Sequence, residues 1–232
     1  MHVFYNTGII DRNAVLNAEE SAHCARVLRL TAGETVLLLD GSGKMYRAKL
    51  TSSNPKRCEL EIVETIAVNR SRDFDISIAI APTKNMDRFE WFVEKAVEIG
   101  VDTITPLLCQ RSERKVINIE RLQKLVISTM KQAIVAKMPV IREMTKFDKF
   151  ISAYDGPLQN RFIAHCLNDD KKLLQKTILP STHAVILIGP EGDFTPEEIQ
   201  SSLNHQFIPV SLGDNRLRTE TAGVVACTVL NA

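Results

Sequence analysis

AVILIGPEGDFTPEEI, the segment at residues 184–199, begins with five apolar residues and continues into a loop of Gly, Pro and charged residues. An uninterrupted apolar run of this length is typical of a strand that is buried on both faces of a sheet. After the loop, Thr195 and Pro196 are residue types that open helices, as the N-cap and the first helical residue. The segment therefore predicts a buried strand, a loop and a helix.

A second segment of the same design, FIPVSLGDNRLRTETAGVVA, lies at residues 207–226. Its strand pattern ends at Ser211, and a helical pattern runs from Thr219 to Leu230. We expect the two loops to lie at the carboxyl ends of neighbouring strands of an open α/β sheet, where small ligands usually bind. The pair of loops therefore predicts a ligand pocket.

Strands alternate with helices from Phe74 onward. Asp87 with Glu90 is expected to form a capping box at the start of the first helix, and Gly100 to end that helix. The residue before a proline avoids the helical region, so the next helix stops before Pro139. The alternation predicts a mainly parallel sheet covered by helices. Strand patterns lie at residues 74–80, 101–108, 162–166 and 184–188, and helical patterns at residues 87–99, 119–137, 196–203 and 219–230.

The first 70 residues are β-rich instead. Two strand patterns flank the turn residues Asp40–Gly43 as in a hairpin, and residues 58–66 alternate apolar and charged side chains like a half-buried strand. One short helix fits at about residues 18–28. We predict a small barrel or sandwich, which the polar segment at residues 68–73 separates from the α/β part.

The composition is that of an ordinary globular protein, with 44% apolar and 25% charged residues in a chain of 232. The first residues lack the basic leader and apolar run of a signal peptide, and no later run approaches the roughly 20 apolar residues of a membrane helix. We therefore expect a cytoplasmic protein that does not enter a membrane. The five cysteines are scattered and never form a C-x-x-C pair, which favours reduced structural thiols and no metal site.

The formal net charge is only +1, but basic residues gather in two regions. Residues 26–57 hold seven basic and two acidic side chains, and residues 111–149 hold ten basic and four acidic ones. Such regions suit phosphate backbones, although solvated lysines explain the counts equally well. At the first region, His23, Arg26 and Arg29 share a helical face by their i, i+3 spacing, which is either a phosphate-contacting or a solvated face.

The loop that begins at Gly189 has the composition of a ligand-contacting turn. Gly189 and Gly192 leave room for main-chain groups to reach a ligand directly. The glycine spacings of nucleotide-binding loops are absent. Glu191 and Asp193 disfavour a phosphate ligand and suit one that carries positive charge.

Arg218 is the candidate for chemistry in the second loop. It precedes Thr219 and Glu220 at the start of a helix, where orphan N–H groups and the positive end of the helix dipole lie. Thr219 as the N-cap gives these residues a purely structural role, but capping alone does not explain two arginines, Arg216 and Arg218, in one loop. The forked donors of Arg218 suit a carboxylate, a phosphate or a developing oxyanion.

Five blocks of sequence together carry a specific resemblance. In their order and spacing, the blocks resemble the ribosomal RNA uridine N3-methyltransferases of the RsmE family, which belongs to the SPOUT class. The resemblance covers essentially the whole chain. The blocks are HCARVLRL (residues 23–30), KNMDRFEWFVEKAVEIGVDTITPL (84–107), MKQAIVAKMPVI (130–141), GPEGDFTPEE (189–198) and LGDNRLRTETA (212–222).

The resemblance implies a PUA-like RNA-binding β-barrel at residues 1–70 and a SPOUT methyltransferase domain at residues 73–232. The second domain is expected to be an α/β fold with a parallel sheet, helices on both faces and a deep trefoil knot. The resemblance further implies S-adenosyl-L-methionine as the cofactor, a homodimer, and methylation of one uridine in small-subunit (16S) ribosomal RNA, either free or in the assembled subunit.

The chain departs from the family pattern at three positions. Asp193 stands where the family usually has a glycine, so the loop must accommodate a side chain there. Val135 stands where an arginine is common, and Arg216 stands where isoleucine is usual. None of the three departures removes the core pattern.

The resemblance assigns roles to residues at the matching positions. Arg218 is expected to stabilise negative charge on the uracil as its N3 proton leaves, and Glu220 to act as the general base, although a cap or an ion pair fits Glu220 equally well. The expected RNA contacts are His23, Arg26, Arg29 and Lys84. The expected cofactor-binding residues are Ile188, Gly189, Pro190, Glu191, Gly192, Leu212, Gly213, Asn215, Leu217, Thr221 and Ala222.

Two other functions are compatible with the same pattern. One is a noncatalytic, dimeric RNA-binding factor of ribosome assembly, in which the C-terminal domain only dimerises. The other is a SPOUT methyltransferase that acts on a different RNA base. The presence of both ligand loops favours an enzyme, because a scaffold needs neither.

Overall fold

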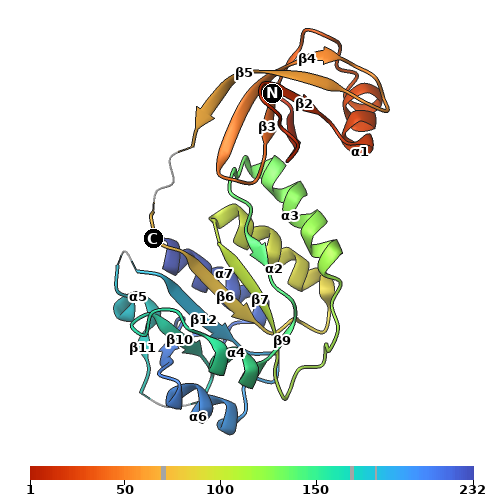
Figure 1. Cartoon of the computed structure of the whole chain (residues 1–232). Coiled ribbons are helices and arrows are strands. Elements are labelled where there is room, and N and C mark those ends of the chain that lie inside the picture. Colours follow the sequence, from red (N-terminus) through yellow and green to blue (C-terminus); the bar gives the residue numbers. More distant parts are fainter. Residues whose placement is uncertain (69–71, 168–169, 181) are drawn as a thin grey trace. The chain divides into compact units, whose positions relative to one another are not determined.

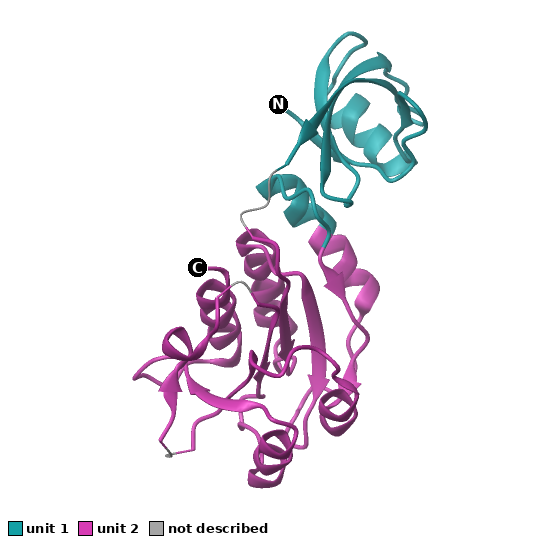
Figure 2. Ribbon diagram, turned by 60° about the vertical axis from the view of Figure 1, so that its left-hand side comes forward, with its two compact units in different colours: residues 1–71, 127–138 teal, residues 72–126, 139–232 magenta. Residues whose placement is uncertain are grey.

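The chain folds into two compact units, which Figure 2 colours separately. The computed structural model describes residues 1–68, 72–167, 170–180 and 182–232. Residues 69–71 of the polar segment expected to separate two domains lie outside the described residues. Each unit has a hydrophobic core of its own.

The first unit, residues 1–71 and 127–138, is built on a five-stranded sheet with the order β1-β3-β4-β5-β2 (Figure 1). β1 pairs with β3 in parallel, and the pairs β3–β4, β4–β5 and β2–β5 are antiparallel. The predicted hairpin is confirmed, because Leu39 pairs with Met45 across its turn. The strands are β1 (Val3–Tyr5), β2 (Asn13–Val15), β3 (Thr35–Leu39), β4 (Lys44–Ser52) and β5 (Glu59–Ala67).

The helix predicted at residues 18–28 is present, but it is not a uniform α-helix. α1 (Ala18–Ala22) continues as the π-helix η1 (His23–Val27), and Arg29 follows with a left-handed φ of 55°. A π-helix winds more residues into each turn than an α-helix, and Arg29 lies beyond its end, so the predicted i, i+3 face is wrong. The three side chains are nevertheless all exposed: His23, Arg26 and Arg29.

The C-terminal half of α3 (Ile119–Ala133) belongs to the first unit. Within that unit, Lys131 Nζ lies 2.6 Å from Glu20 Oε1. The predicted helix reaches Lys137, whereas α3 ends at Ala133 because Ile134 turns the chain with a left-handed φ of 56°. Residues 127–138 join the first unit through contacts with residues far away in the sequence, so no local periodicity predicts this arrangement.

The second unit, residues 72–126 and 139–232, is an α/β fold around an eight-stranded sheet. The order is β11-β13-β10-β12-β6-β7-β8, with β9 also paired to β7, and these described pairs are all parallel. The predicted parallel sheet is therefore confirmed. The strands are β6 (Ile76–Ile80), β7 (Thr103–Leu108), β8 (Val140–Ile141), β9 (Thr145–Lys146), β10 (Arg161–Ala164), β11 (Lys172–Leu173), β12 (Ala184–Ile188) and β13 (Ile208–Ser211).

Helices cover both faces of this sheet (Figure 1). α2 (Met86–Ile99) and α7 (Thr219–Asn231) pack together on one face, and α4 (Phe147–Ala153) and α6 (Pro196–Asn204) pack on the other. The short α5 (Leu174–Thr177) follows β11 at the sheet edge. The predicted fold class is confirmed, while the trefoil knot stays a prediction.

α2 and α7 make a close contact at a glycine. A Cβ added to Gly223 on α7 would come within 2.6 Å of the ring of Phe92 on α2 and within 2.9 Å of Ile80 on β6. A protein interior has no spare volume to absorb such an overlap. Gly223 therefore sets how closely the two helices pack.

At α2 and α6, two predicted end signals are confirmed and one is wrong. Thr195 caps α6 as predicted, and Gly100 ends α2 with a left-handed φ of 107°. The capping box of Asp87 and Glu90 is not formed. Asn85 is the N-cap instead, because its side chain accepts a hydrogen bond of 3.0 Å from the Asp87 N–H.

A buried arginine, Arg72, ties the start of the second unit to the residue before β7 and to the last helix. Arg72 Nη1 lies 2.7 Å from Asp102 Oδ2, and the two side chains are only 6% and 7% exposed. The same guanidinium donates to Asn231 Oδ1 at 2.7 Å and to the carbonyl oxygen of Gly100. Asp102 Oδ2 also accepts a hydrogen bond of 2.9 Å from the Ile76 N–H. One arginine therefore holds several chain segments together.

In the described part of the chain, no helix has both the length and the apolar character needed to cross a membrane. The described residues also contain no group of three or more His, Cys, Asp and Glu side chains placed to hold a metal ion. All five cysteines are unpaired thiols, and only Cys166 is exposed.

Candidate active site

The loops that follow β12 and β13 lie at one edge of the sheet, but they do not follow adjacent strands. β10 lies between the two in the order β13-β10-β12, which corrects the expectation of neighbouring strands. The residues after β10 therefore form a third wall between the two loops. This carboxyl-end edge is the usual place for a ligand in an open α/β sheet.

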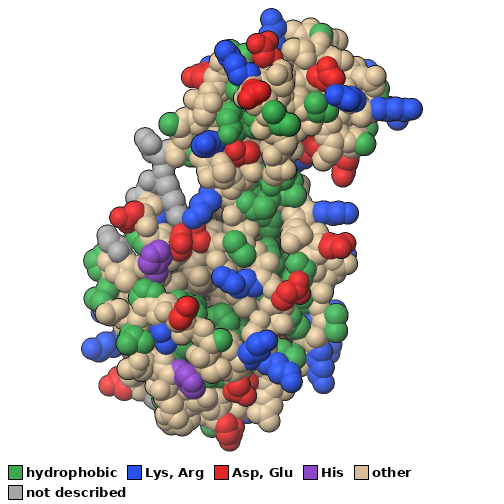
Figure 3. Space-filling model, viewed as in Figure 1, with side chains coloured by type: hydrophobic (Ala, Val, Ile, Leu, Met, Phe, Trp, Pro, Cys, Tyr) green, Lys and Arg blue, Asp and Glu red, His purple; other side chains and the backbone are tan. Residues whose placement is uncertain are grey.

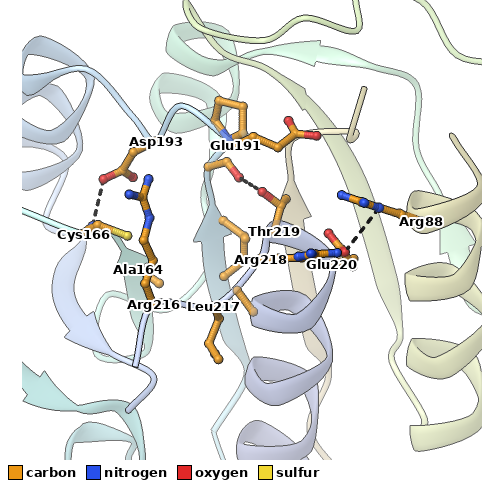
Figure 4. A pocket seen from close by; sticks show the side chains of 14 residues that line it. Arg88, Ala164, Cys166, Glu191, Asp193, Arg216, Leu217, Arg218, Thr219 and Glu220 are labelled. Carbon is orange, nitrogen blue, oxygen red and sulfur yellow. Dashed lines mark hydrogen bonds and ion pairs between the residues drawn. The ribbon is translucent and has the colours of Figure 1, made fainter. Parts of the chain in front are cut away.

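Two adjoining cavities open at this edge, with volumes of about 400 and 580 Å³. Both volumes fall within the range of small-molecule sites, about 300–1,000 Å³. The first cavity is lined by the loop after β12 and the start of α7 (Figure 4), and the second by the loop after β13 and the chain after β10. The two cavities share five lining residues, which a ligand that occupies both cavities would contact. They are Ala164, Cys166, Arg216, Leu217 and Ala222.

The loop after β12 is held by contacts at Gly189. A Cβ at this position would lie 3.1 Å from the ring of Phe194, so the turn leaves little room for a side chain. The buried hydroxyl of Thr219 donates a hydrogen bond of 3.1 Å to the carbonyl oxygen of Gly189. Thr219 is thus not the N-cap of α7, because Arg218 takes that position. Its hydroxyl ties the two loops together instead.

Glu191 connects the loop after β12 with the loop after the adjacent strand β6. The backbone N–H of Lys84 donates to Glu191 Oε1 at 2.9 Å. The ammonium of Lys84 pairs with Glu113 Oε2 at 2.7 Å, and this contact raises the pKa of Lys84. From the loop after β7, Arg111 donates to the carbonyl oxygen of Gly192 at 2.8 Å. The three loops therefore support one another, and Glu191 has a structural partner.

Asp193, one of the departures from the family pattern, adopts a left-handed φ of 62°. Aspartate is among the few non-glycine residues that tolerate this conformation, because its short side chain bonds to nearby backbone. Its Oδ1 accepts from the Phe194 N–H at 2.9 Å, and its Oδ2 accepts from the Cys166 N–H at 2.8 Å (Figure 4). The carboxylate therefore links the loop after β12 to the chain after β10.

Arg218 and Glu220 line the first cavity at the start of α7 (Figure 4). Arg218 is exposed, and no described residue bonds to its side chain. Glu220 is 7% exposed, and its Oε2 has no hydrogen-bond partner in the described part of the chain. Arg88 on α2 approaches Glu220 Oε1 only to 3.9 Å. Buried polar atoms are normally hydrogen-bonded, so this arrangement indicates a functional site.

The loop after β13 leaves backbone donors available beside the second cavity. Within the described residues, no backbone acceptor bonds the N–H groups of residues 214–217. Gly213 precedes them with a φ of 141°, a conformation that residues with a side chain rarely adopt. Because backbone N–H groups need partners, these donors suit a ligand with acceptor atoms.

The structure gathers most of the predicted cofactor-binding residues around the two cavities. Gly192 and Thr221 line neither of them. Lys84 lies in the supporting loop after β6, and the other predicted RNA contacts lie in the first unit. The roles assigned to all these residues stay predictions. The predicted residues that line the cavities are Ile188, Gly189, Pro190, Glu191, Leu212, Gly213, Asn215, Leu217 and Ala222.

Sequence reasoning missed the third wall of the site and one arginine. The third wall could have been predicted, because ligands bind at the carboxyl ends of parallel strands and a strand was predicted at residues 162–166. Arg88 carries no local signal, since it reaches the site only through the packing of α2. The missed residues are Arg88, Ala164, His165, Cys166, Leu167 and Lys171.

Two family models match the chain. The model of an RNA methyltransferase domain matches residues 70–231, which is more than half of the chain. The model of an RNA methyltransferase PUA domain matches residues 16–63. The matches therefore place an RNA methyltransferase domain after a PUA domain.

Named proteins and solved structures match nearly the whole chain. Ribosomal RNA small subunit methyltransferase E of Synechocystis sp. is 30% identical over 229 residues, covering 97% of this chain and 74% of that protein. A crystal structure of a "probable rRNA-methyltransferase" from Porphyromonas gingivalis matches with a TM-score of 0.90 and 40% identity, over 98% of this chain and 95% of that one. Ribosomal RNA small subunit methyltransferase E from Neisseria gonorrhoeae, bound to S-adenosyl methionine, matches with a TM-score of 0.86 and 27% identity, over 98% and 96%. The chain therefore belongs to the ribosomal RNA small subunit methyltransferase E family of RNA methyltransferases.

Proposed function

We propose that this protein transfers the methyl group of S-adenosyl-L-methionine to N3 of a uridine in the RNA of the small ribosomal subunit. One observation carries the proposal: the first cavity combines an exposed arginine, Arg218, with a buried carboxylate oxygen of Glu220, and neither has a partner among the described residues. The family supplies the reaction class. Glu220 supplies a proton acceptor for the N–H of the uracil, and Arg218 supplies positive charge that stabilises the resulting anion.

The cavities fit S-adenosyl-L-methionine in size and in chemistry. Their combined space suits an elongated ligand, and the available N–H groups at residues 214–217 suit the acceptor atoms of a nucleoside. The carboxylates of Glu191 and Asp193 suit its positive charges. When bound, the cofactor supplies an electrophilic methyl group on a sulfonium. The residues that would hold it line the cavities from the loops after β12 and β13.

In the proposed reaction, Glu220 and Arg218 act on the uracil ring. N3 of uridine carries a proton, so this nitrogen becomes a nucleophile only as the proton leaves. Glu220 Oε2 accepts that proton, because it is the buried oxygen in the first cavity that lacks a donor. Negative charge then spreads onto the carbonyl oxygens that flank N3, and the forked donors of Arg218 stabilise it.

The first unit is proposed to position the RNA. Residues 16–63 match a PUA domain, and Arg26 and Arg29 are exposed in this unit. Figure 3 shows basic side chains interspersed with acidic ones on the visible face, rather than gathered in one broad patch. We therefore assign the phosphate contacts to individual arginines. Such contacts fix the register of the RNA without reading its sequence.

The working form is proposed to be a homodimer in the cytoplasm, where it meets small-subunit ribosomal RNA either free or in the assembled subunit. Both features rest on the family resemblance. Light scattering on the purified protein measures the mass directly. A fully active monomer contradicts the proposed dimer.

One assay separates the proposed function from its two alternatives. Purified protein is incubated with methyl-labelled S-adenosyl-L-methionine and small subunits that lack the modification, and the RNA is digested to nucleosides for mass spectrometry. We expect label in N3-methyluridine. RNA that stays unlabelled identifies a noncatalytic assembly factor, and label in another nucleoside identifies a methyltransferase of different specificity.

Replacing Arg26 and Arg29 together with alanine is expected to weaken RNA binding and to lower its salt dependence. Each lost phosphate contact reduces the slope of log affinity against log salt by about one unit, so the double variant loses about two. Filter binding at several salt concentrations measures this slope. The matched control replaces Lys56 and Arg57, an exposed basic pair of the same unit. An equal effect in both variants would show that Arg26 and Arg29 are solvated surface residues that make no specific RNA contact.

Alkylation at neutral pH is expected to modify Cys166 alone, and saturating S-adenosyl-L-methionine is expected to slow it. Cys166 is exposed and lines both cavities. Burial raises the pKa of Cys24 and of Cys227 to about 12 and also raises that of Cys109, and the thiolate is the reactive form. Peptide mass spectrometry measures the labelled sites. A labelling rate at Cys166 that the cofactor leaves unchanged argues against its place in the wall.

A further inference from the structure

Asp193 and Arg216 stand at the junction of the two cavities, and both depart from the family pattern. Arg216 lines both cavities, and Asp193 lines the first. Figure 4 shows the side chain of Arg216 extending toward Asp193. The two do not form an ion pair, since no described cation lies within 4.0 Å of the Asp193 carboxylate. A gap therefore separates two opposite charges at one site.

The carboxylate of Asp193 retains capacity for a ligand. Its two hydrogen bonds come from the backbone N–H groups of Phe194 and Cys166, which are neutral donors. A carboxylate has about four lone-pair sites, so each oxygen can accept a further bond. These backbone bonds hold the side chain in one position without neutralising its charge.

The guanidinium of Arg216 is available as well. The residue is exposed, and no described residue bonds to its side chain. A guanidinium carries donors in a rigid fork that matches a carboxylate in two parallel bonds. The pair therefore offers a carboxylate site and an ammonium site side by side.

We propose that Arg216 and Asp193 form the subsite for the amino-acid end of S-adenosyl-L-methionine, with Arg216 binding the α-carboxylate and Asp193 binding the α-ammonium. The inference rests on the proposed function. A ligand that carries both charges on one carbon matches the two side chains together. An RNA phosphate would suit Arg216 but would be repelled by Asp193, so the pair favours the zwitterion.

The subsite has a consequence for specificity. With both charges at these positions, the proposed subsite gives this chain a selectivity that depends on the amino-acid end of its ligand. It distinguishes S-adenosyl-L-methionine from 5′-methylthioadenosine, which has the same nucleoside but no amino acid. Decarboxylated S-adenosylmethionine is the intermediate case, because it keeps the ammonium and lacks the carboxylate.

Calorimetric binding of these three compounds to two variants tests the subsite. Arg216→Ile is expected to weaken S-adenosyl-L-methionine by about tenfold and to leave the other two compounds within about twofold. Asp193→Asn keeps an acceptor for a backbone N–H and tolerates the left-handed turn. It is expected to weaken S-adenosyl-L-methionine and its decarboxylated form by about tenfold, with 5′-methylthioadenosine unchanged.

The outcomes separate the subsite from the proposed function. The matched control is Arg142→Ile, an exposed arginine of the same unit that lines neither cavity, and all its affinities should equal those of the wild type. If Arg216→Ile weakens all three compounds equally or none of them, the subsite is wrong. If it lowers RNA affinity alone, Arg216 binds phosphate and the subsite is again wrong. A wild-type protein that binds none of the three compounds overturns the proposed function itself.

Discussion

Replacing Arg218 with alanine is expected to lower the rate of methyl transfer by about 10²- to 10³-fold, the usual effect of losing one donor to a developing oxyanion. The affinity for S-adenosyl-L-methionine should stay within about twofold, because the proposed cofactor contacts come from the loop backbones and from Arg216 and Asp193, and the charge that Arg218 stabilises forms only on the uracil. Single-turnover transfer to small subunits measures the rate, and calorimetry measures the affinity.

Two further variants sharpen this result. Arg218→Lys keeps the positive charge but loses the forked donors, so its rate should lie between those of alanine and arginine. Arg142→Ala, on the same unit and away from the cavities, should transfer at the wild-type rate. Full activity in Arg218→Ala removes the arginine from the chemistry, and equal loss of cofactor binding assigns it to the cofactor instead.

Replacing Arg72 with alanine is expected to destabilise the second unit by about 3–5 kcal/mol, because the buried Asp102 carboxylate then loses its ion pair with Arg72. For a unit of this size, the loss corresponds to a fall in Tm of roughly 10 °C. The side chain of Asn231 and the carbonyl oxygen of Gly100 lose a donor at the same time. Thermal unfolding followed by circular dichroism measures the change.

Arg57→Ala is the matched control for burial. Its ion pair with Glu59 lies at the surface, with side chains 68% and 47% exposed, and exposed pairs contribute only about 0–1 kcal/mol. The two variants therefore remove the same kind of contact in different surroundings. Equal melting of Arg72→Ala and the wild type would show that the buried pair contributes nothing to stability.

Local sequence signals predicted the elements that depend on neighbouring residues. The apolar run at residues 184–188 forms a strand, because five consecutive apolar residues suit a strand that is buried on both faces of a sheet. Thr195 caps the next helix because its hydroxyl needs only a backbone N–H three residues away. The same local chemistry predicted that Gly100 would end α2. Both loops of the candidate site followed from such signals.

The features that were missed depend on contacts between distant residues. Thr219 has the composition of an N-cap, but Gly189 offers its hydroxyl an acceptor from another loop. The place of β10 between β12 and β13 is a matter of strand order, which periodicity does not encode. Residues 23–27 wind as a π-helix although their pattern suits an α-helix equally well. The order of the two domains followed from the local patterns, and the family resemblance supplied their identities as a PUA-like barrel and a methyltransferase domain.

The absence of a side chain at Gly223 determines where the proposed base lies. This residue lies one turn beyond Glu220 on α7, and its contact with Phe92 sets α7 against α2, the helix that carries Arg88. The spacing between Arg88 and Glu220 therefore depends on a buried helix contact that lines neither cavity. We expect a single methyl group at this point to shift the start of α7, and with it the proposed base, although the amino-acid residues of the site stay chemically unchanged.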